Sequence, residues 1–293
     1  MDKIVEGRVV IVTGAGRGIG RAEALAFARG GAKVVVNDLA TPEEDPAAAV
    51  VAEIEAFGGE AIADHTDVSD WAGAERLVAS AVGTYGDLHV VVNNAGILRD
   101  RMLVNMSERE WDDVIRVHLR GTFAVTRHAA AHWRTRSKAG DDVRASVINT
   151  SSASGLYGNA GQANYGAAKA GIASFSVIAA EELRRYGVRV NAIAPTALTR
   201  MTEGLRERGQ EEKLAMDPAR VASLVVWLGS TNSEVTGRVF NVGGGRISVA
   251  EGWVAGPEIA DDGLTPAELG KLLPVLTARA RGNSAMDGRT RTL

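Results

Sequence analysis

Short runs of apolar, β-branched residues alternate with longer alanine-rich segments over most of the chain. This alternation is typical of βαβ units, in which helices cover both faces of a parallel sheet. The apolar runs predict seven strands, at residues 9–13, 33–37, 60–63, 88–92, 145–150, 188–193 and 239–242. The segments between them predict helices at residues 18–29, 46–57, 71–85, 111–136, 164–186 and 218–227. The expected fold is α/β, a Rossmann-type doubly wound parallel seven-stranded sheet with helices on both faces.

The strand–helix alternation ends after residue 242, and the remainder of the chain shows no comparable pattern. We therefore expect one domain, residues 1–249, followed by a C-terminal extension, residues 250–293, that packs on the same domain or on a neighbouring subunit. A charged stretch at residues 199–217 follows the sixth predicted strand. Open α/β sheets bind ligands at the carboxyl ends of their strands, so this stretch is a candidate substrate lid.

Composition excludes several classes of protein. The 293 residues include no Cys, which excludes disulfide scaffolds, thiolate nucleophiles and Cys-ligated metal sites. A net charge of −3 provides no basic field for a nucleic acid. No apolar run approaches the roughly 18–20 residues of a membrane span, and residues 1–7 lack the apolar core of a signal peptide. We expect a soluble, cytoplasmic protein without nucleic-acid or membrane partners.

A glycine-rich segment, T-G-A-G-R-G-I-G at residues 13–20, lies between the first predicted strand and the first predicted helix. Glycines in this setting permit a tight turn, close approach of the backbone to a pyrophosphate and packing of the helix on the sheet. The helix N-terminus adds N–H donors and a positive dipole. The segment predicts a dinucleotide site, and its candidate cofactor-binding residues are Gly14, Arg17, Gly18, Ile19 and Gly20.

Asp38, at the end of the second predicted strand, indicates which dinucleotide binds. A carboxylate at this position accepts hydrogen bonds from the adenosine ribose and repels a 2′-phosphate. No Lys or Arg follows within residues 39–44, so the sequence favours NAD over NADP. Arg17 is the opposing feature, because an arginine in the glycine loop could pair with a 2′-phosphate.

Tyr165 and Lys169 form a candidate catalytic pair. Their i, i+4 spacing places both on one helix face, about 5–6 Å apart at Cβ. An ammonium beside a phenol should lower the phenol pKa, as a general base for alcohol oxidation requires. Ser152 follows the fifth predicted strand and could hold the substrate oxygen beside Tyr165, although Ser151 and Ser154 could also take this part.

Taken together, the glycine loop, N-N-A-G at residues 93–96, and Ser152 with Tyr165-x-x-x-Lys169 resemble the short-chain dehydrogenase/reductase family over residues 4–246. The resemblance implies that Tyr165 is the acid/base, that Lys169 lowers its pKa and holds the nicotinamide ribose, and that Ser152 positions the substrate. It also implies no metal and further cofactor contacts from Asp67, Val68, Asn94, Ala95, Gly96, Pro195, Ala197 and Thr199.

His118 stands where this family usually has an asparagine that completes a proton relay. Two interpretations remain open. In the first, only the backbone carbonyl matters, acting through a water, and any side chain serves. In the second, the imidazole, whose ordinary pKa is about 6.5, joins the relay.

Longer stretches at residues 93–101, 116–123, 151–165 and 194–202 resemble one branch of the family, the dehydrogenase part of peroxisomal multifunctional enzyme type 2. That resemblance implies NAD-dependent oxidation of a (3R)-3-hydroxyacyl-CoA to the 3-ketoacyl-CoA. The candidate partners for the CoA phosphates are Arg99, Arg101, Arg200, Arg206 and Arg208.

The alternative activity is an NAD(P)-dependent dehydrogenase or reductase of a steroid, a steroid side-chain thioester or another bulky secondary alcohol. An NAD-binding sensor without turnover is disfavoured because the Ser, Tyr and Lys are all intact. The family resemblance also implies a homodimer or homotetramer that assembles through the two helices beginning near Trp111 and Asn164.

Overall fold

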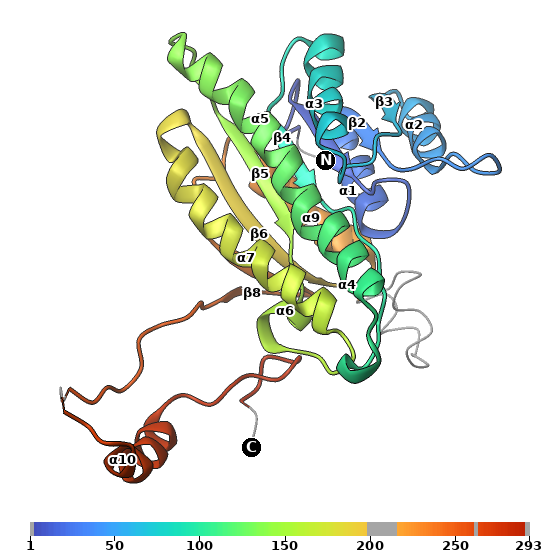
Figure 1. Ribbon diagram of the computed structural model, residues 1–293. Coiled ribbons are helices and arrows are strands. Elements are labelled where there is room, and N and C mark those ends of the chain that lie inside the picture. Colours follow the sequence, from blue (N-terminus) through green and yellow to red (C-terminus); the bar gives the residue numbers. More distant parts are fainter. Residues whose placement is uncertain (1–2, 198–215, 261–262, 291–293) are drawn as a thin grey trace. The chain divides into compact units, whose positions relative to one another are not determined.

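The computed structural model in Figure 1 describes residues 3–197, 216–260 and 263–290. Its contacts divide the chain into two compact units, Met1–Ala250 and Glu251–Leu293. The division falls within one residue of the predicted boundary. Where the extension packs remains a prediction.

The first unit is built on one sheet with the strand order β3-β2-β1-β4-β5-β6-β7-β8. Strands β1 to β7 run parallel, and β8 pairs with β7 in the antiparallel sense. The strands are β1 Val9–Thr13, β2 Lys33–Asn37, β3 Glu60–Asp64, β4 Val90–Asn93, β5 Ala145–Thr150, β6 Val188–Thr196, β7 Val239–Gly243 and β8 Arg246–Ala250. The seven predicted strands are all present, and the order places the reversal between β1 and β4, as in doubly wound folds.

The eighth strand corrects the predicted count of seven. β7 ends at Gly243, and Gly244 and Gly245 have φ of +58° and +75°, which allows the chain to reverse directly into β8. The first four residues of β8 are exposed. Because β8 lies at the sheet edge, it lacks the continuous apolar run by which buried parallel strands are recognised.

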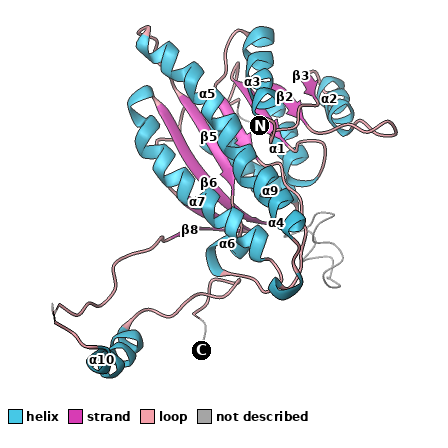
Figure 2. Ribbon diagram, in the orientation of Figure 1, coloured by secondary structure: helices cyan, strands magenta, loops and turns pink. Residues whose placement is uncertain are grey.

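Helices cover both faces of the sheet (Figure 2). Helices α1 Gly18–Arg29, α2 Pro46–Ala56 and α9 Pro218–Gly229 pack with the sheet around one buried cluster. Helices α3 Trp71–Tyr85, α5 Gly121–Lys138 and α7 Ala163–Leu183 pack around a second cluster. The continuous apolar sequences of β1 and β4 follow from this arrangement, because both faces of each strand are buried.

The predicted helix at 111–136 is divided into three parts. It consists of α4 Glu108–Ile115, a π-helical turn η2 Arg116–Arg120 and α5. A capping box between Ser107 and Glu110 starts α4 earlier than predicted. The remaining short elements are η1 Leu103–Asn105, α6 Ala153–Tyr157 and η3 Arg184–Tyr186.

A buried chain of side-chain hydrogen bonds joins the sheet to α5 and α7. Asn93 Nδ2 at the end of β4 donates to Thr126 Oγ1 (2.9 Å) and to Asn149 Oδ1 on β5 (2.8 Å). Asn149 Nδ2 donates in turn to Ser176 Oγ on α7 (2.9 Å). All four residues are buried, so this network fixes the two helices against the strands that end at the candidate site.

The second unit contains the helix α10 Pro266–Arg279, which begins with a capping box between Thr265 and Glu268. No residue of α10 is buried. In the part of the chain that the structure describes, no helix is long and apolar enough to cross a membrane.

Candidate active site

The glycine loop between β1 and α1 is pressed against the loop that follows β4. Gly14 has φ +61°, and a Cβ there would lie 2.7 Å from Ala95 Cα. Asn94 Nδ2 donates to the carbonyls of Thr13 and Gly14, both at 3.0 Å. A Cβ on Gly20, the third residue of α1, would collide with Gly14 O, so the first turn of this helix requires glycine at that position.

The N-terminus of α1 is open to an anion. Its N-cap residue, Arg17, makes no side-chain cap, whereas the N-cap residues of α2 and α3, Asp45 and Asp70, both do. Gly18, the first residue of α1, has φ +56°. Uncapped N–H groups, a positive helix dipole and a backbone without side chains are what a pyrophosphate requires, so this loop fits a dinucleotide.

Asp38 lies against the same loop. Its Oδ2 accepts from the N–H of Gly16 at 2.9 Å, and its Oδ1 accepts from the N–H of Leu39 at 2.9 Å. A Cβ on Gly16 would lie 2.8 Å from Asp38 Oδ2, so the carboxylate can reach the loop only over a glycine. Arg17, in contrast, forms an ion pair with Glu44.

Asp67 and Val68 follow β3 at the carboxyl edge of the sheet. Burial alone would raise the pKa of Asp67, but hydrogen bonds from Ser69 and Arg116 outweigh it and lower that pKa. The Asp67 carboxylate is therefore ionised, with acceptors already engaged by Ser69 (2.6 Å to its hydroxyl) and by Arg116 (3.2 Å). Val68 is buried against Gly121 at the start of α5.

Ser152, Tyr165 and Lys169 come together at the carboxyl end of β5. Ser152 is the N-cap residue of α6, while Tyr165 and Lys169 lie on α7. Lys169 is buried, its Nζ donates to Thr150 O at 2.6 Å, and this Nζ lies 5.6 Å from the centre of the Tyr165 ring. A hydrogen bond from Ser152 acts on the Tyr165 hydroxyl.

The neighbouring serines have other partners. Ser151 Oγ donates to the backbone carbonyl of Lys169 at 2.8 Å, and Ser154 Oγ donates to Gln162 Oε1 at 2.7 Å. Of the three serines, Ser152 is the one whose hydroxyl acts on Tyr165. The geometry thus favours Ser152 over the two alternatives.

The pKa of Tyr165 is shifted in the opposite direction to the one expected from the sequence. Burial lowers the pKa of Lys169 to about 7, so near neutral pH this ammonium carries only part of its charge. Burial raises the pKa of Tyr165; the Ser152 hydrogen bond opposes this rise, and the negative charge of Asp100 adds to it. Burial, Ser152 and Asp100 account for the raised pKa of Tyr165, and the role of Lys169 in lowering it stays a prediction.

His118 lies in the π-helical turn η2, with its ring buried beside Tyr165. The two rings meet edge to face, with their centroids 5.2 Å apart. His118 Nε2 lies 3.0 Å from the N and 2.8 Å from the O of Ile97, so the tautomer decides which of these it bonds. Burial, aided by the charge of Lys169, lowers the pKa of His118 to about 3, so this imidazole is neutral at physiological pH.

The missing side chain at Gly96 leaves room for the His118 ring. A Cβ at Gly96 would collide with His118 Cε1, so the N-N-A-G segment requires its glycine to pass the imidazole. Pro195 and Ala197 lie at the end of β6, at the same edge of the sheet. Thr199, Arg200, Arg206 and Arg208 lie outside the described residues.

Asn164 is a site residue that the sequence interpretation did not assign. It is fully buried, and its Nδ2 donates to the carbonyls of Arg99 and Glu110, both at 3.0 Å. Its Oδ1 accepts from the N–H of Tyr165 at 2.8 Å. These bonds fix the first turn of α7. In the sequence, only the position of Asn164 next to Tyr165 could have indicated this role.

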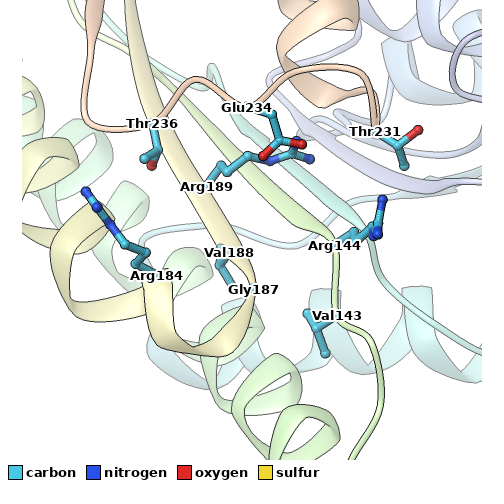
Figure 3. Close-up of a pocket in the computed structure, with 9 residues that line it drawn as sticks. All are labelled: Val143, Arg144, Arg184, Gly187, Val188, Arg189, Thr231, Glu234 and Thr236. Carbon is cyan, nitrogen blue, oxygen red and sulfur yellow. The ribbon is translucent and has the colours of Figure 1, made fainter.

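A separate pocket of about 430 Å³ lies at the opposite, amino edge of the sheet (Figure 3). Its three arginines all have protein partners. Arg144 bonds Asp142 (3.1 Å), Arg184 bonds Glu181 (2.8 Å), and Arg189 bonds Ser146 and the carbonyl of Ser230 (both 3.1 Å). None of the predicted site residues lines this pocket.

Comparison with known proteins gives concordant matches. The short chain dehydrogenase family model matches residues 8–212. The crystal structure of a short chain dehydrogenase from Mycobacterium avium superposes with a TM-score of 0.90 at 55% identity, covering 96% of this chain and 98% of that one.

Two curated relatives carry more specific names. Hydroxyacyl-CoA dehydrogenase ChsB1 of Mycobacterium tuberculosis is 50% identical over 258 residues, 84% of this chain and 80% of the relative. Peroxisomal multifunctional enzyme type 2 of Mus musculus is 47% identical over 248 residues, 83% of this chain but 32% of that protein. This chain belongs to the short-chain dehydrogenase family of NAD(P)-dependent oxidoreductases that act on CH–OH groups.

Proposed function

We propose that this protein oxidises a (3R)-3-hydroxyacyl-CoA to the 3-ketoacyl-CoA with NAD as the acceptor. The observation that carries the reaction type is the meeting of Ser152, Tyr165 and buried Lys169 at the sheet edge that also holds the glycine loop. The substrate class is supported by the name of the relative that is 50% identical, a hydroxyacyl-CoA dehydrogenase.

The residues of the site fit both halves of the cofactor, the adenosine half with its pyrophosphate and the nicotinamide half. The pyrophosphate would lie on the glycine loop and the N-terminus of α1, with Asp38 accepting from the adenosine ribose. Asp67 and Val68 would adjoin the adenine. The residues that would adjoin the nicotinamide half are Asn94, Ala95, Gly96, Pro195 and Ala197, and Thr199 is a further candidate that lies outside the described residues. When bound, NAD supplies the acceptor for the hydride that leaves the substrate carbon.

The chain's own groups manage the proton. Ser152 holds the substrate oxygen, and the phenolate form of Tyr165 takes the hydroxyl proton as the carbonyl forms. The cost of forming a phenolate at a buried site is met by Lys169, because its ammonium and the phenolate stabilise each other. With its pKa at about 7, Lys169 can take up a full proton as the phenolate develops.

His118 has a positioning role in this scheme. A neutral ring whose Nε2 is engaged by Ile97 orients Tyr165 and the N-N-A-G segment rather than exchanging protons. A relay through the imidazole is therefore disfavoured, but the contacts of the ring with Tyr165 and Gly96 also disagree with the first interpretation, in which any side chain serves. If His118→Asn displaces the pH–rate profile, the imidazole takes part in the relay.

The segment after β4 supports an acyl-CoA substrate. Arg99 and Arg101 lie there, and Arg101 is followed by three exposed apolar side chains, Met102, Leu103 and Val104. Cations for phosphates next to an apolar surface for an acyl chain are the two features that such a thioester requires. Arg101 is paired with Glu110 at 3.2 Å on the protein surface, where ion pairs are weak enough to exchange partners.

The test is to follow NAD reduction by the purified protein with matched substrates. The panel contains (3R)- and (3S)-3-hydroxyacyl-CoA thioesters of several lengths, the free 3-hydroxy acids, and steroid alcohols. We expect the (3R) thioesters to have the highest kcat/KM. A steroid or a free secondary alcohol that exceeds every CoA thioester would overturn the substrate assignment.

A further inference from the structure

Arg17 and Glu44 form an ion pair beside the adenosine end of the proposed cofactor site. Arg17 is the N-cap residue of α1, and Glu44 lies in the loop between β2 and α2. Their side chains are 38% and 56% exposed. Arg17 therefore has an acidic partner within the protein, although an arginine in a glycine loop is a natural partner for a phosphate.

The loop that carries Glu44 is fixed at both ends. Thr41 and Glu44 exchange backbone hydrogen bonds of 2.9 Å and 3.3 Å, which closes a tight turn. The next residue, Asp45, caps α2 and pairs with His65 at 3.2 Å. Pro46 then packs over the glycine loop, where a Cβ on Gly16 would lie 2.5 Å from Pro46 Cβ. These contacts hold the Glu44 carboxylate close to Arg17.

This arrangement discriminates between the two dinucleotides by charge. The 2′-phosphate of NADP carries nearly two negative charges at pH 7, as other phosphate monoesters do. Asp38 already repels it from the glycine loop. Glu44 adds a second negative charge and also occupies Arg17, the cation of the loop. NAD has no phosphate at this position and is unaffected by either effect.

We propose that Glu44 is a specificity-determining residue that selects NAD against NADP by pairing with Arg17. The inference rests on the proposed function, in which NAD is the cofactor. Without the Glu44 carboxylate, Arg17 becomes available to a 2′-phosphate while the contacts that serve NAD are unchanged.

The experiment measures Kd for NAD⁺ and NADP⁺ by isothermal titration calorimetry with the full chain, in the absence of substrate. The variant is Glu44→Gln, and the matched control is Glu43→Gln, which removes the same charge one residue away. We expect Glu44→Gln to tighten NADP⁺ binding about three- to fivefold, consistent with the modest strength of exposed ion pairs, and to change NAD⁺ binding less than about twofold. Glu43→Gln should change either Kd less than about twofold.

Arg17→Ala in the Glu44→Gln background distinguishes pairing from a general field effect. If Arg17 is the group released, the gain in NADP⁺ affinity disappears in the double variant. Equal gains in the two Glu→Gln variants, no gain in Glu44→Gln, or a gain that survives Arg17→Ala would each overturn the inference. A wild-type protein that binds NADP⁺ more tightly than NAD⁺ would instead contradict the proposed cofactor. Thermal melts establish that every variant is folded.

Discussion

At the residue scale, Glu23 and Lys169 are two of the ionisable side chains that are buried at an electrostatic cost. Glu23 on α1 is fully buried, both of its carboxylate oxygens lack a hydrogen-bond partner among the described residues, and burial raises its pKa to about 8. Lys169 is buried with its pKa lowered to about 7. Glu23 has no place in the proposed chemistry, whereas Lys169 lies where a phenolate would form. The cost at Lys169 is thus the kind of strain expected at a functional site.

The cost at Lys169 gives a pH-dependent prediction. Below pH 7 the lysine is protonated in both states, and the folded protein bears the full burial cost. Between pH 7 and about 10 the unfolded chain holds more protons than the folded one, so wild-type stability gains from Lys169 as pH rises. We expect Lys169→Met to increase the free energy of unfolding by roughly 1–3 kcal/mol at pH 6, and this advantage to shrink toward pH 10.

Denaturant melts at several pH values measure this difference, and the exposed Lys138→Met is the matched control. A Lys169→Met protein that is less stable than wild type at pH 6, or an advantage independent of pH, would contradict the assigned electrostatics. Activity should be lost in Lys169→Met and retained in Lys138→Met.

Sequence reasoning at the residue scale succeeded where a residue type is forced by geometry. Gly14, Gly20 and Gly96 all lie where a Cβ would meet another backbone or ring, and each was recognised from its motif. The raised pKa of Tyr165 and the ion pair of Arg17 could not be predicted. The first depends on burial and the second on a partner distant in sequence, and spacing along the chain reveals neither.

At the element scale, the sequence predicted the strands that are buried on both faces and the helices that bury one face against the sheet. β8, α6 and α10 were missed because they are short, or lie at an edge, or bury no residue. The π-helical turn η2 was also missed, since five residues with one shifted hydrogen-bond register leave no mark on an apolar pattern. This turn carries His118, so one detail of the site was hidden within an otherwise correctly predicted helical region.

The buried network between β4, β5, α5 and α7 provides a test at the same scale. Asn149→Leu leaves one N–H of the Asn93 amide without an acceptor and the Ser176 oxygen without a donor, although each group keeps its other bond, to Thr126 and to Ile172 respectively. Unsatisfied buried polar groups cost about 1–3 kcal/mol each, so we expect a loss of about 3 kcal/mol in the free energy of unfolding. The exposed Asn232→Leu should change it by less than about 0.5 kcal/mol. Equal, small losses in urea melts of both variants would show that the network does not fix the helices.

At the scale of the whole molecule, the predicted association is supported by an exposed apolar surface on α5 and α7. Figure 1 shows these helices side by side over one face of the sheet. Phe123, Val177 and Ile178 are 43%, 45% and 54% exposed, and the rings of Phe123 and Phe175 lie 6.3 Å apart between the two helices. Clustered exposed apolar side chains of this kind mark contact surfaces. We propose that a second copy of the chain covers them.

Ile178→Glu introduces a charge on that surface. Because burying an unpaired carboxylate is costly, we expect the mass measured by light scattering at micromolar concentration to fall by at least half. Phe57→Glu, at another exposed apolar position, is the matched control and should leave the mass unchanged. An unaltered mass for Ile178→Glu would place the interface elsewhere.

The central claim, that Tyr165 is the acid/base of a dehydrogenase, is tested most directly by Tyr165→Phe. The measurement is kcat for NAD reduction with the best (3R)-3-hydroxyacyl-CoA, together with Kd for NAD⁺, and Tyr186→Phe on η3 serves as the control. We expect kcat to fall about 10³-fold in Tyr165→Phe while Kd for NAD⁺ changes less than about threefold. A Tyr165→Phe enzyme that retains more than about a tenth of the wild-type kcat would contradict it.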